Sequence, residues 1–221
     1  MTSSRKLTVD DIEDLRAYER EREEFRDRII ALKKRRRIGV GPHVTLLFEN
    51  RDTIRFQIQE MARAEKILSD EGIETELRAY NPLIPEPGHL STTLFVELTS
   101  DELLREWLPK LVGIERSVVL GAGSGGERQA VRCRVDSDHE ALLTRDEITA
   151  SVHYIHFDVP PAAIDALAES GGTLEIDHPE YSYAVALTDE NVAELLADLR
   201  DDTHVIKDWT GPHEGREDRY Q

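Results

Sequence analysis

The chain has 221 residues, of which 28 are Lys or Arg and 45 are Asp or Glu, giving a formal net charge of −17. This negative charge repels phosphate backbones and argues against a nucleic acid partner. No apolar run approaches the roughly 18 residues that a membrane span needs, and the N-terminus MTSSRKLTVDD lacks the apolar stretch of a signal peptide. We therefore expect an acidic, cytoplasmic protein with no membrane contact.

Cys133 is the one cysteine of the chain. A single thiol excludes an internal disulfide, and it also excludes a four-thiolate zinc or iron–sulfur site built by one chain. In AVRCRV it shares a strand face with Val131 and Val135, which predicts a buried small apolar side chain. No cofactor is expected on these grounds. A metal site formed by histidine and carboxylate side chains is still compatible with the sequence.

Residues 1–38 are predicted to form a long amphipathic helix. Thr8 and Asp11 have the spacing of a capping box, and Gly39 follows the other end. Arg22 interrupts an apolar stripe of residues three, four or seven apart, formed by Ile12, Leu15, Tyr18, Phe25, Ile29 and Leu32. Such a helix would span about 40 Å at 1.5 Å per residue. Because that exceeds the width of a small domain, part of the stripe is expected to serve a partner or a second subunit.

Residues 39–136 are predicted to form a βαββαβ unit, the order of a ferredoxin-like fold. Ser100 caps the second helix of this unit, DELLREWLPKLV. The glycine-rich GAGSGG is followed by a strand rather than a helix, which favours a hairpin connection over a phosphate-binding loop. The expected strands are 43–49, 73–80, 92–99, 117–120 and 128–135, and the first expected helix is 52–70.

Residues 145–208 suggest a second, weaker βαββα(β) unit packed on the first, ending in a short strand, HVIKDW. Residues 209–221 form a polar tail. The predicted fold class is therefore α+β, with a long N-terminal helix followed by a ferredoxin-like βαββαβ unit and this second unit. Whether the two units share one sheet stays open.

The helix at 52–70 carries a carboxylate in an unusual position. At 100° per residue, Glu65 falls within its main apolar sector, while Glu60 lies near Phe56 on the opposite side. A carboxylate in an apolar setting pairs with a cation, binds a metal or has a raised pKa. Arg22, in its odd position in the apolar stripe, is the predicted partner of Glu65 in a buried ion pair.

His43 offers an alternative to that ion pair. It shares a strand face with Thr45, Leu47 and Glu49, next to the helix that carries Glu60 and Glu65. Imidazole and carboxylates are the residue types of a metal or proton-transfer site, and these candidates are His43, Glu60 and Glu65. Their spacing matches no known motif, and a hydrogen-bonded structural histidine fits equally well.

The second pair of histidines does not point to a metal. His153 and His156 lie three residues apart on a predicted strand, so their side chains point to opposite faces of the sheet. His153 is expected to be buried with its apolar neighbours. The sequence also contains no Walker loop, HExxH motif, EF-hand loop or nucleophile elbow, so the catalytic residues stay unknown and a non-catalytic protein is favoured.

The run of cations that ends the first helix has two interpretations. It can bind an acidic partner, or it can be a solvated helix end that favours the negative pole of the helix dipole. The candidate partner-binding residues are Lys33, Lys34, Arg35, Arg36 and Arg37.

Several blocks of sequence resemble a bacterial family known as domain of unknown function 3501. They are residues 7–67, AYNPLIPEPG, ELTSDELLREWLPKLVGIE, VHYIHF and DHPEY. The resemblance carries no assigned reaction. It implies a role beside redox or peroxide-handling proteins, since genes of that family tend to neighbour genes for rubrerythrin-like proteins and cysteine-rich iron–sulfur oxidoreductases.

Two functions follow as expectations. The first is a non-catalytic accessory protein that docks to a redox partner through the long helix and its basic end. The second is a metal-binding enzyme that uses His43, Glu60 and Glu65. A small-ligand regulator is a third, because paired ferredoxin-like units can enclose a pocket.

Overall fold

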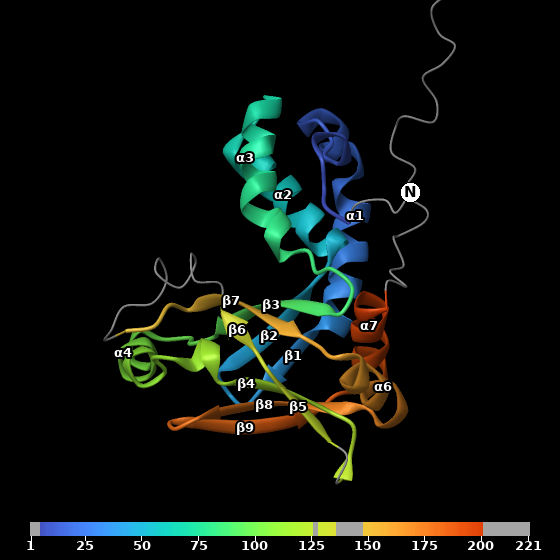
Figure 1. Ribbon diagram of the computed structural model, residues 1–221. Coiled ribbons are helices and arrows are strands. Elements are labelled where there is room, and N and C mark those ends of the chain that lie inside the picture. Colours follow the sequence, from blue (N-terminus) through green and yellow to red (C-terminus); the bar gives the residue numbers. More distant parts are fainter. Residues whose placement is uncertain (1–4, 126–127, 136–147, 201–221) are drawn as a thin grey trace, which may run out of the picture.

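Two antiparallel β-sheets lie face to face in the computed structural model, which describes residues 5–125, 128–135 and 148–200 (Figure 1). The first sheet has the strand order β1-β2-β3-β7-β6. Its strands are β1 (Arg37–Val40), β2 (Val44–Glu49), β3 (His89–Val96), β7 (Val152–Asp158) and β6 (Arg134–Val135). The second sheet has the order β5-β4-β8-β9 and consists of β5 (Gln129–Arg132), β4 (Val118–Ala122), β8 (Gly172–His178) and β9 (Tyr181–Ala186).

The main hydrophobic core lies between these sheets. Alternate residues of the first sheet point inward, including Leu46, Phe48 and Phe157, and they meet Leu120 and Leu174 of the second sheet. This is the period-2 pattern that strands with one covered face require. Helices α6 (Pro161–Ser170) and α7 (Asp189–Leu199) cover one side of the stack, and α4 (Asp101–Lys110) lies at the other (Figure 1).

Three helices stand above the first sheet as an arm: α1 (Leu15–Arg36), α2 (Arg51–Glu65) and α3 (Asp70–Tyr80) (Figure 1). The long N-terminal helix is confirmed, but it begins at Leu15. The Asp14 carboxylate caps it by accepting hydrogen bonds from the backbone N–H groups of Arg16 and Ala17, both at 2.9 Å. Short 3-10 turns lie at Val9–Asp11, Asn81–Leu83 and Ile114–Arg116. The capping box of Thr8 and Asp11 closes the first of these turns instead of the helix.

Helix α2 is covered on two sides, as its two apolar faces predict. Ile54 and Ile58 join a cluster with Leu77 of α3, while Phe56 packs against the stripe of α1. That stripe is the predicted one, since its buried members are Tyr18, Phe25, Ile29 and Leu32. The arm therefore has a small core of its own, in two layers on either side of α2.

The strand predicted over 73–80 is wrong, because these residues belong to α3. The alternating pattern of Ile73, Thr75 and Leu77 also fits a helix, in which Ile73 and Leu77 lie one turn apart on the buried face. The Ser69 hydroxyl accepts a hydrogen bond from the backbone N–H of Gly72, and two acidic residues occupy the first turn. The helix-start signals of this segment therefore outweigh its alternation.

With that strand replaced by a helix, the βαββαβ order of a ferredoxin-like unit is not shown for residues 39–136. The α+β class is confirmed. Each sheet takes strands from both of the ranges 39–136 and 145–208, since β7 joins the first sheet and β4 joins the second. The strand expected in HVIKDW and the polar tail at 209–221 lie outside the described residues.

The face of the first sheet that meets the arm is more polar than its inner face. Its cross-strand register places Glu49 opposite Ser91, and Ser91 opposite His156. The next row pairs Leu47 with Thr93, and Thr93 pairs in turn with Tyr154 of β7. The same strands that build the core thus present carboxylate, hydroxyl and imidazole groups toward the helices.

Candidate functional site

Arg22 forms the ion pair that its position in the apolar stripe predicts, but with Glu60. Its Nη2 donates to Glu60 Oε2 at 2.7 Å, and its Nε donates to Oε1 at 2.8 Å. The Tyr18 hydroxyl donates to the same Oε1 at 2.6 Å. These hydrogen bonds, with those from Arg22 foremost, hold the pKa of Glu60 below its ordinary value against the opposing effect of burial. This cluster of hydrogen bonds joins α1 to α2 and has a structural role.

Glu65 does not take part in this cluster. It is exposed at the last turn of α2, where Lys66 adopts the left-handed conformation with φ of 58° and ends the helix. The predicted pair Arg22–Glu65 is therefore not formed. Burial first, and then the nearby charge of Glu65, raise the pKa of Glu76 on α3. The buried residues of α2 extend only to Ala62, so Glu65 lies beyond the buried part of the helix.

His43 lies at the opposite end of β2 from α2. Its backbone N–H donates to the Tyr181 hydroxyl at 2.9 Å, and its ring lies 4.9 Å from the ring of Trp107, centroid to centroid. The Tyr181 hydroxyl also accepts from Val44 N and donates to Val40 O, at 3.1 and 2.8 Å. Gly41, with φ of 75°, makes the turn beneath these rings. His43 is thus part of the packing that joins the β1–β2 hairpin to β9.

The three candidate metal ligands are not brought together. The length of β2 separates His43 from α2, on which Glu60 is held by Arg22 and Glu65 is exposed. Within the described ranges, no group of three or more His, Cys, Asp or Glu side chains could hold a metal ion. His153 is buried, as expected, and its Nε2 lies 2.9 Å from both Thr149 Oγ1 and Ala150 O.

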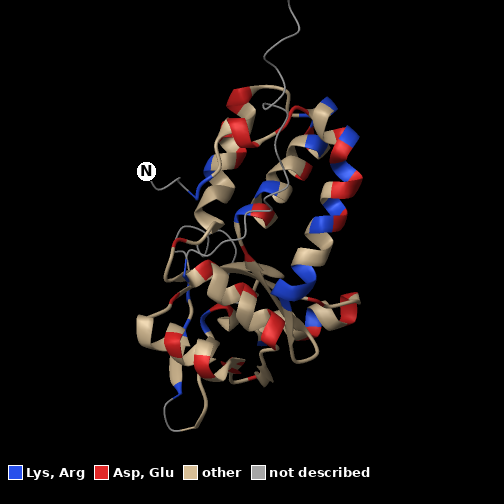
Figure 2. Ribbon diagram, turned by 90° about the vertical axis from the view of Figure 1, so that its right-hand side faces the viewer, with Lys and Arg blue, Asp and Glu red and all other residues tan. Residues whose placement is uncertain are grey.

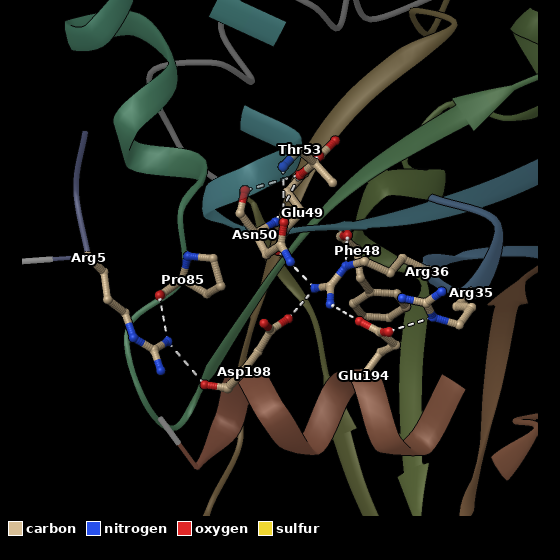
Figure 3. A network of polar contacts seen from close by, with 10 residues as sticks. All are labelled: Arg5, Arg35, Arg36, Phe48, Glu49, Asn50, Thr53, Pro85, Glu194 and Asp198. Carbon is tan, nitrogen blue, oxygen red and sulfur yellow. Dashed lines mark hydrogen bonds and ion pairs between the residues drawn. The ribbon is translucent and has the colours of Figure 1, made fainter. Parts of the chain in front are cut away.

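Part of the basic run turns inward (Figure 3). Arg36 is 1% exposed, and its guanidinium donates to the backbone oxygens of Phe48 at 2.8 Å and Glu49 at 3.3 Å. It also pairs with Asp198 of α7 and, at 3.0 Å, with Glu194. Burial raises the pKa of Asp198 although the Arg36 charge opposes that rise. Arg36 therefore fastens α1 and β2 to α7.

The neighbours of Arg36 are more exposed. Arg35 pairs with Glu194 at 2.7 Å, and Arg37 pairs with Glu97 on the surface. Lys33 Nζ lies 5.4 Å from the centroid of the Phe56 ring, and Lys34 is exposed. The run at Lys33–Arg37 is consequently engaged within the chain for the most part, rather than presented as one basic surface.

A cavity of about 120 Å³ lies between the arm and the polar face of the first sheet. Its lining comes from α1, α2, β2, β3, β7, the end of α3 and the 3-10 turn that follows α3. The lining residues are Lys33, Leu47, Glu49, Ile54, Gln57, Tyr80, Leu83, Thr93, Phe95, Val152 and Tyr154. This volume is below the roughly 300 to 1,000 Å³ of sites for drug-sized ligands, so the cavity has room only for a small molecule.

Glu49 is the charged group buried deepest in this lining, at 6% exposed. Its Oε1 accepts from the Thr93 hydroxyl at 2.7 Å, and its Oε2 accepts from the Thr53 hydroxyl at 2.5 Å. Burial, followed by the charges of Tyr80 and Glu49, raises the pKa of Tyr154. The arrangement is a carboxylate oriented by two hydroxyls beside two phenols, and it is able to accept hydrogen bonds from a ligand.

Glu49 was placed by sequence on the correct strand face, but its burial was not anticipated. The alternation of Thr45, Leu47 and Glu49 gives no sign that α2 and α3 cover this face. The signal that could have found it is Thr53, four residues later at the start of α2, where a hydroxyl can reach back to the carboxylate.

Fold and site together define an α+β protein of two stacked sheets with a three-helix arm and a carboxylate-containing cavity beneath it. The chain belongs to the family described as protein of unknown function (DUF3501), whose model matches residues 6–199. It is similar to a solved structure, a novel protein of unknown function from Burkholderia pseudomallei K96243, with 38% sequence identity. The match has a TM-score of 0.78 and covers 88% of this chain and 99% of that chain.

No curated protein matches the chain. The described helices include none that is both long enough and apolar enough to cross a membrane.

Proposed function

We propose that this chain is a non-catalytic, cytoplasmic accessory protein that docks to a protein partner through its helical arm. The observation that carries the proposal is the arm itself, which stands off the sheets and has its own core on both sides of α2 (Figure 1). An element of this kind offers a partner two sides and a tip without disturbing the main core.

The tip of the arm has an apolar contact to offer. Leu68, in the turn between α2 and α3, is 84% exposed, which is far more than Ile30 of α1 or Ile148 near β7, each at 49%. The outer face of α1 alternates acidic and basic residues (Figure 2). An apolar anchor with charged surroundings is a common composition for a specific protein interface.

The partner that we propose is a rubrerythrin-like or iron–sulfur protein. The family resemblance supports this choice of partner. Cys133 is buried and is the one cysteine of the chain, so the chain cannot hold a four-cysteine cluster by itself. A redox role would therefore require a partner that holds the cluster. Arg36 faces inward, so the basic run is not available as a single binding surface. We therefore place the proposed contact on the arm. The separation of His43 from Glu60 does not favour the alternative metal-binding enzyme.

Co-purification from the native host in mild salt tests this function. The tagged chain should retain a rubrerythrin-like or iron–sulfur protein, identified by mass spectrometry and by the visible absorbance of its iron centre. Leu68→Asp should reduce the recovered partner at least tenfold. Ile148→Asp makes the same change on the body and should leave the recovery unchanged. Recovery of the wild-type chain without any such protein would contradict the proposal.

A further inference from the structure

The cavity under the arm contains an incompletely satisfied carboxylate. A carboxylate has about four lone-pair sites for hydrogen bonds. Glu49 uses them for one hydrogen bond from Thr93 and one from Thr53, and it forms no ion pair with a residue of the described ranges. Buried carboxylates are usually paired with a cation, because removing a charge from water costs free energy. The lining therefore supplies an anion whose counter-charge is missing.

Two cations, one bonded to the Glu49 backbone and one in the cavity lining, are occupied elsewhere. Arg36 donates to the backbone oxygen of Glu49 and directs its charge to Asp198 and Glu194. Lys33 lines the cavity, but its ammonium group lies over the Phe56 ring. Neither cation neutralises the Glu49 carboxylate, so a cation that enters the cavity would meet an accessible acceptor.

We propose that this cavity binds a small organic molecule through a primary ammonium group that donates hydrogen bonds to Glu49. The rings of Tyr80 and Tyr154 in the lining suit such a group, because aromatic faces attract cations. Lys33 also lines the cavity and repels a second positive charge. The ligand class is consequently a monoamine or an amino acid, and not a diamine.

A thermal-shift titration with propylammonium chloride tests this site. Propanol and sodium propionate serve as the neutral and anionic analogues of the same chain length, and potassium chloride matches the ionic strength. At about ten times its Kd, propylammonium should raise Tm by about 3 to 6 °C. The two analogues and the salt should leave Tm within about 1 °C of the value without additive.

Two variants connect the shift to the cavity. Glu49→Gln keeps the shape of the side chain and removes its charge, and it should abolish the shift. Glu74→Gln removes one charge from the exposed face of α3 and should retain the full shift. Gln57→Trp fills part of the cavity without touching Glu49, so it should weaken binding at least tenfold even if Glu49→Gln folds poorly.

Two results would overturn the proposal. One is the absence of any propylammonium-specific shift up to 100 mM, together with the absence of saturation-transfer NMR signals from the amine. The other is an equal shift in the wild type and in a folded Glu49→Gln variant. Neither result depends on a docked protein partner, so this proposal and the docking function are tested separately.

Discussion

Nη2 of Arg22 lies 2.7 Å from Oε2 of Glu60, and this pair joins the first two helices of the arm at its middle. Both side chains are about one quarter exposed, at 25% and 26%. Two parallel hydrogen bonds to a carboxylate give an arginine pair more strength and geometric definition than a single surface contact. The arm is therefore expected to depend on this pair for its rigidity.

Removing Arg22 should destabilise the arm. We expect Arg22→Met to lower the free energy of unfolding by about 1 to 3 kcal/mol, because Glu60 then retains only the Tyr18 hydroxyl. Urea unfolding of the two single variants and of Arg22→Met with Glu60→Gln gives the coupling energy. The coupling should exceed about 0.5 kcal/mol, and a value near zero would show that the pair does not stabilise the fold.

The contribution of Glu60 should depend on pH. Because its pKa is lower in the folded state than its ordinary 4.5, the ionised form stabilises the fold above that value. This stability is lost as pH falls through the lower, folded pKa. The difference in unfolding free energy between wild type and Glu60→Gln should be constant from pH 7 to 6 and shrink below pH 4.5. A difference that grows in acid would contradict the assigned direction of the shift.

Arg36 should be the most sensitive member of the basic run. Arg36→Met leaves Asp198 buried without its cation and should cost about 3 to 5 kcal/mol of unfolding free energy. Lys34→Met makes the same kind of change at an exposed neighbour and should stay within about 0.5 kcal/mol of wild type. Denaturant unfolding of both variants measures this contrast. Equal effects would mean that the inward-facing network in Figure 3 contributes little.

Cys133 should be inert in the folded protein. Burial raises its pKa to about 11, and its Sγ donates to Glu115 O at 3.2 Å. At pH 7 only about one thiol in ten thousand is then ionised. A thiol-reactive dye should label the native chain slowly and the guanidinium-denatured chain within minutes. Rapid labelling of the native chain would contradict the buried position of this side chain.

Much of the secondary structure was predictable from local patterns. Strand β2 follows the alternation of Val44, Leu46 and Phe48, and α1 follows its apolar stripe. The segment that forms α3 was misassigned as a strand. Over so short a length, Ile73, Thr75 and Leu77 fit both the two-residue period of a strand and the 3.6-residue period of a helix. In such a segment the cap at Ser69 is the better guide, since it specifies a helix start directly.

The site was predictable only in part. An unmatched Arg22 predicted a carboxylate partner on α2, but choosing Glu60 over Glu65 required knowing which side of α2 faces α1 and where α2 ends. The pairing of Arg36 with Asp198 joins residues 162 positions apart, and no local pattern contains that information. The burial of Glu49 likewise depends on how the arm lies over the sheet.

Photo-crosslinking in the native host tests the docking function most directly. A photoreactive amino acid replaces Leu68 at the tip of the arm or, in a parallel strain, Ile148 on the body, and both chains are irradiated in living cells. The docking account predicts a covalent adduct with a rubrerythrin-like or iron–sulfur protein from the Leu68 position and none from Ile148. Adducts with that protein from Ile148 alone, or from neither position, would contradict it.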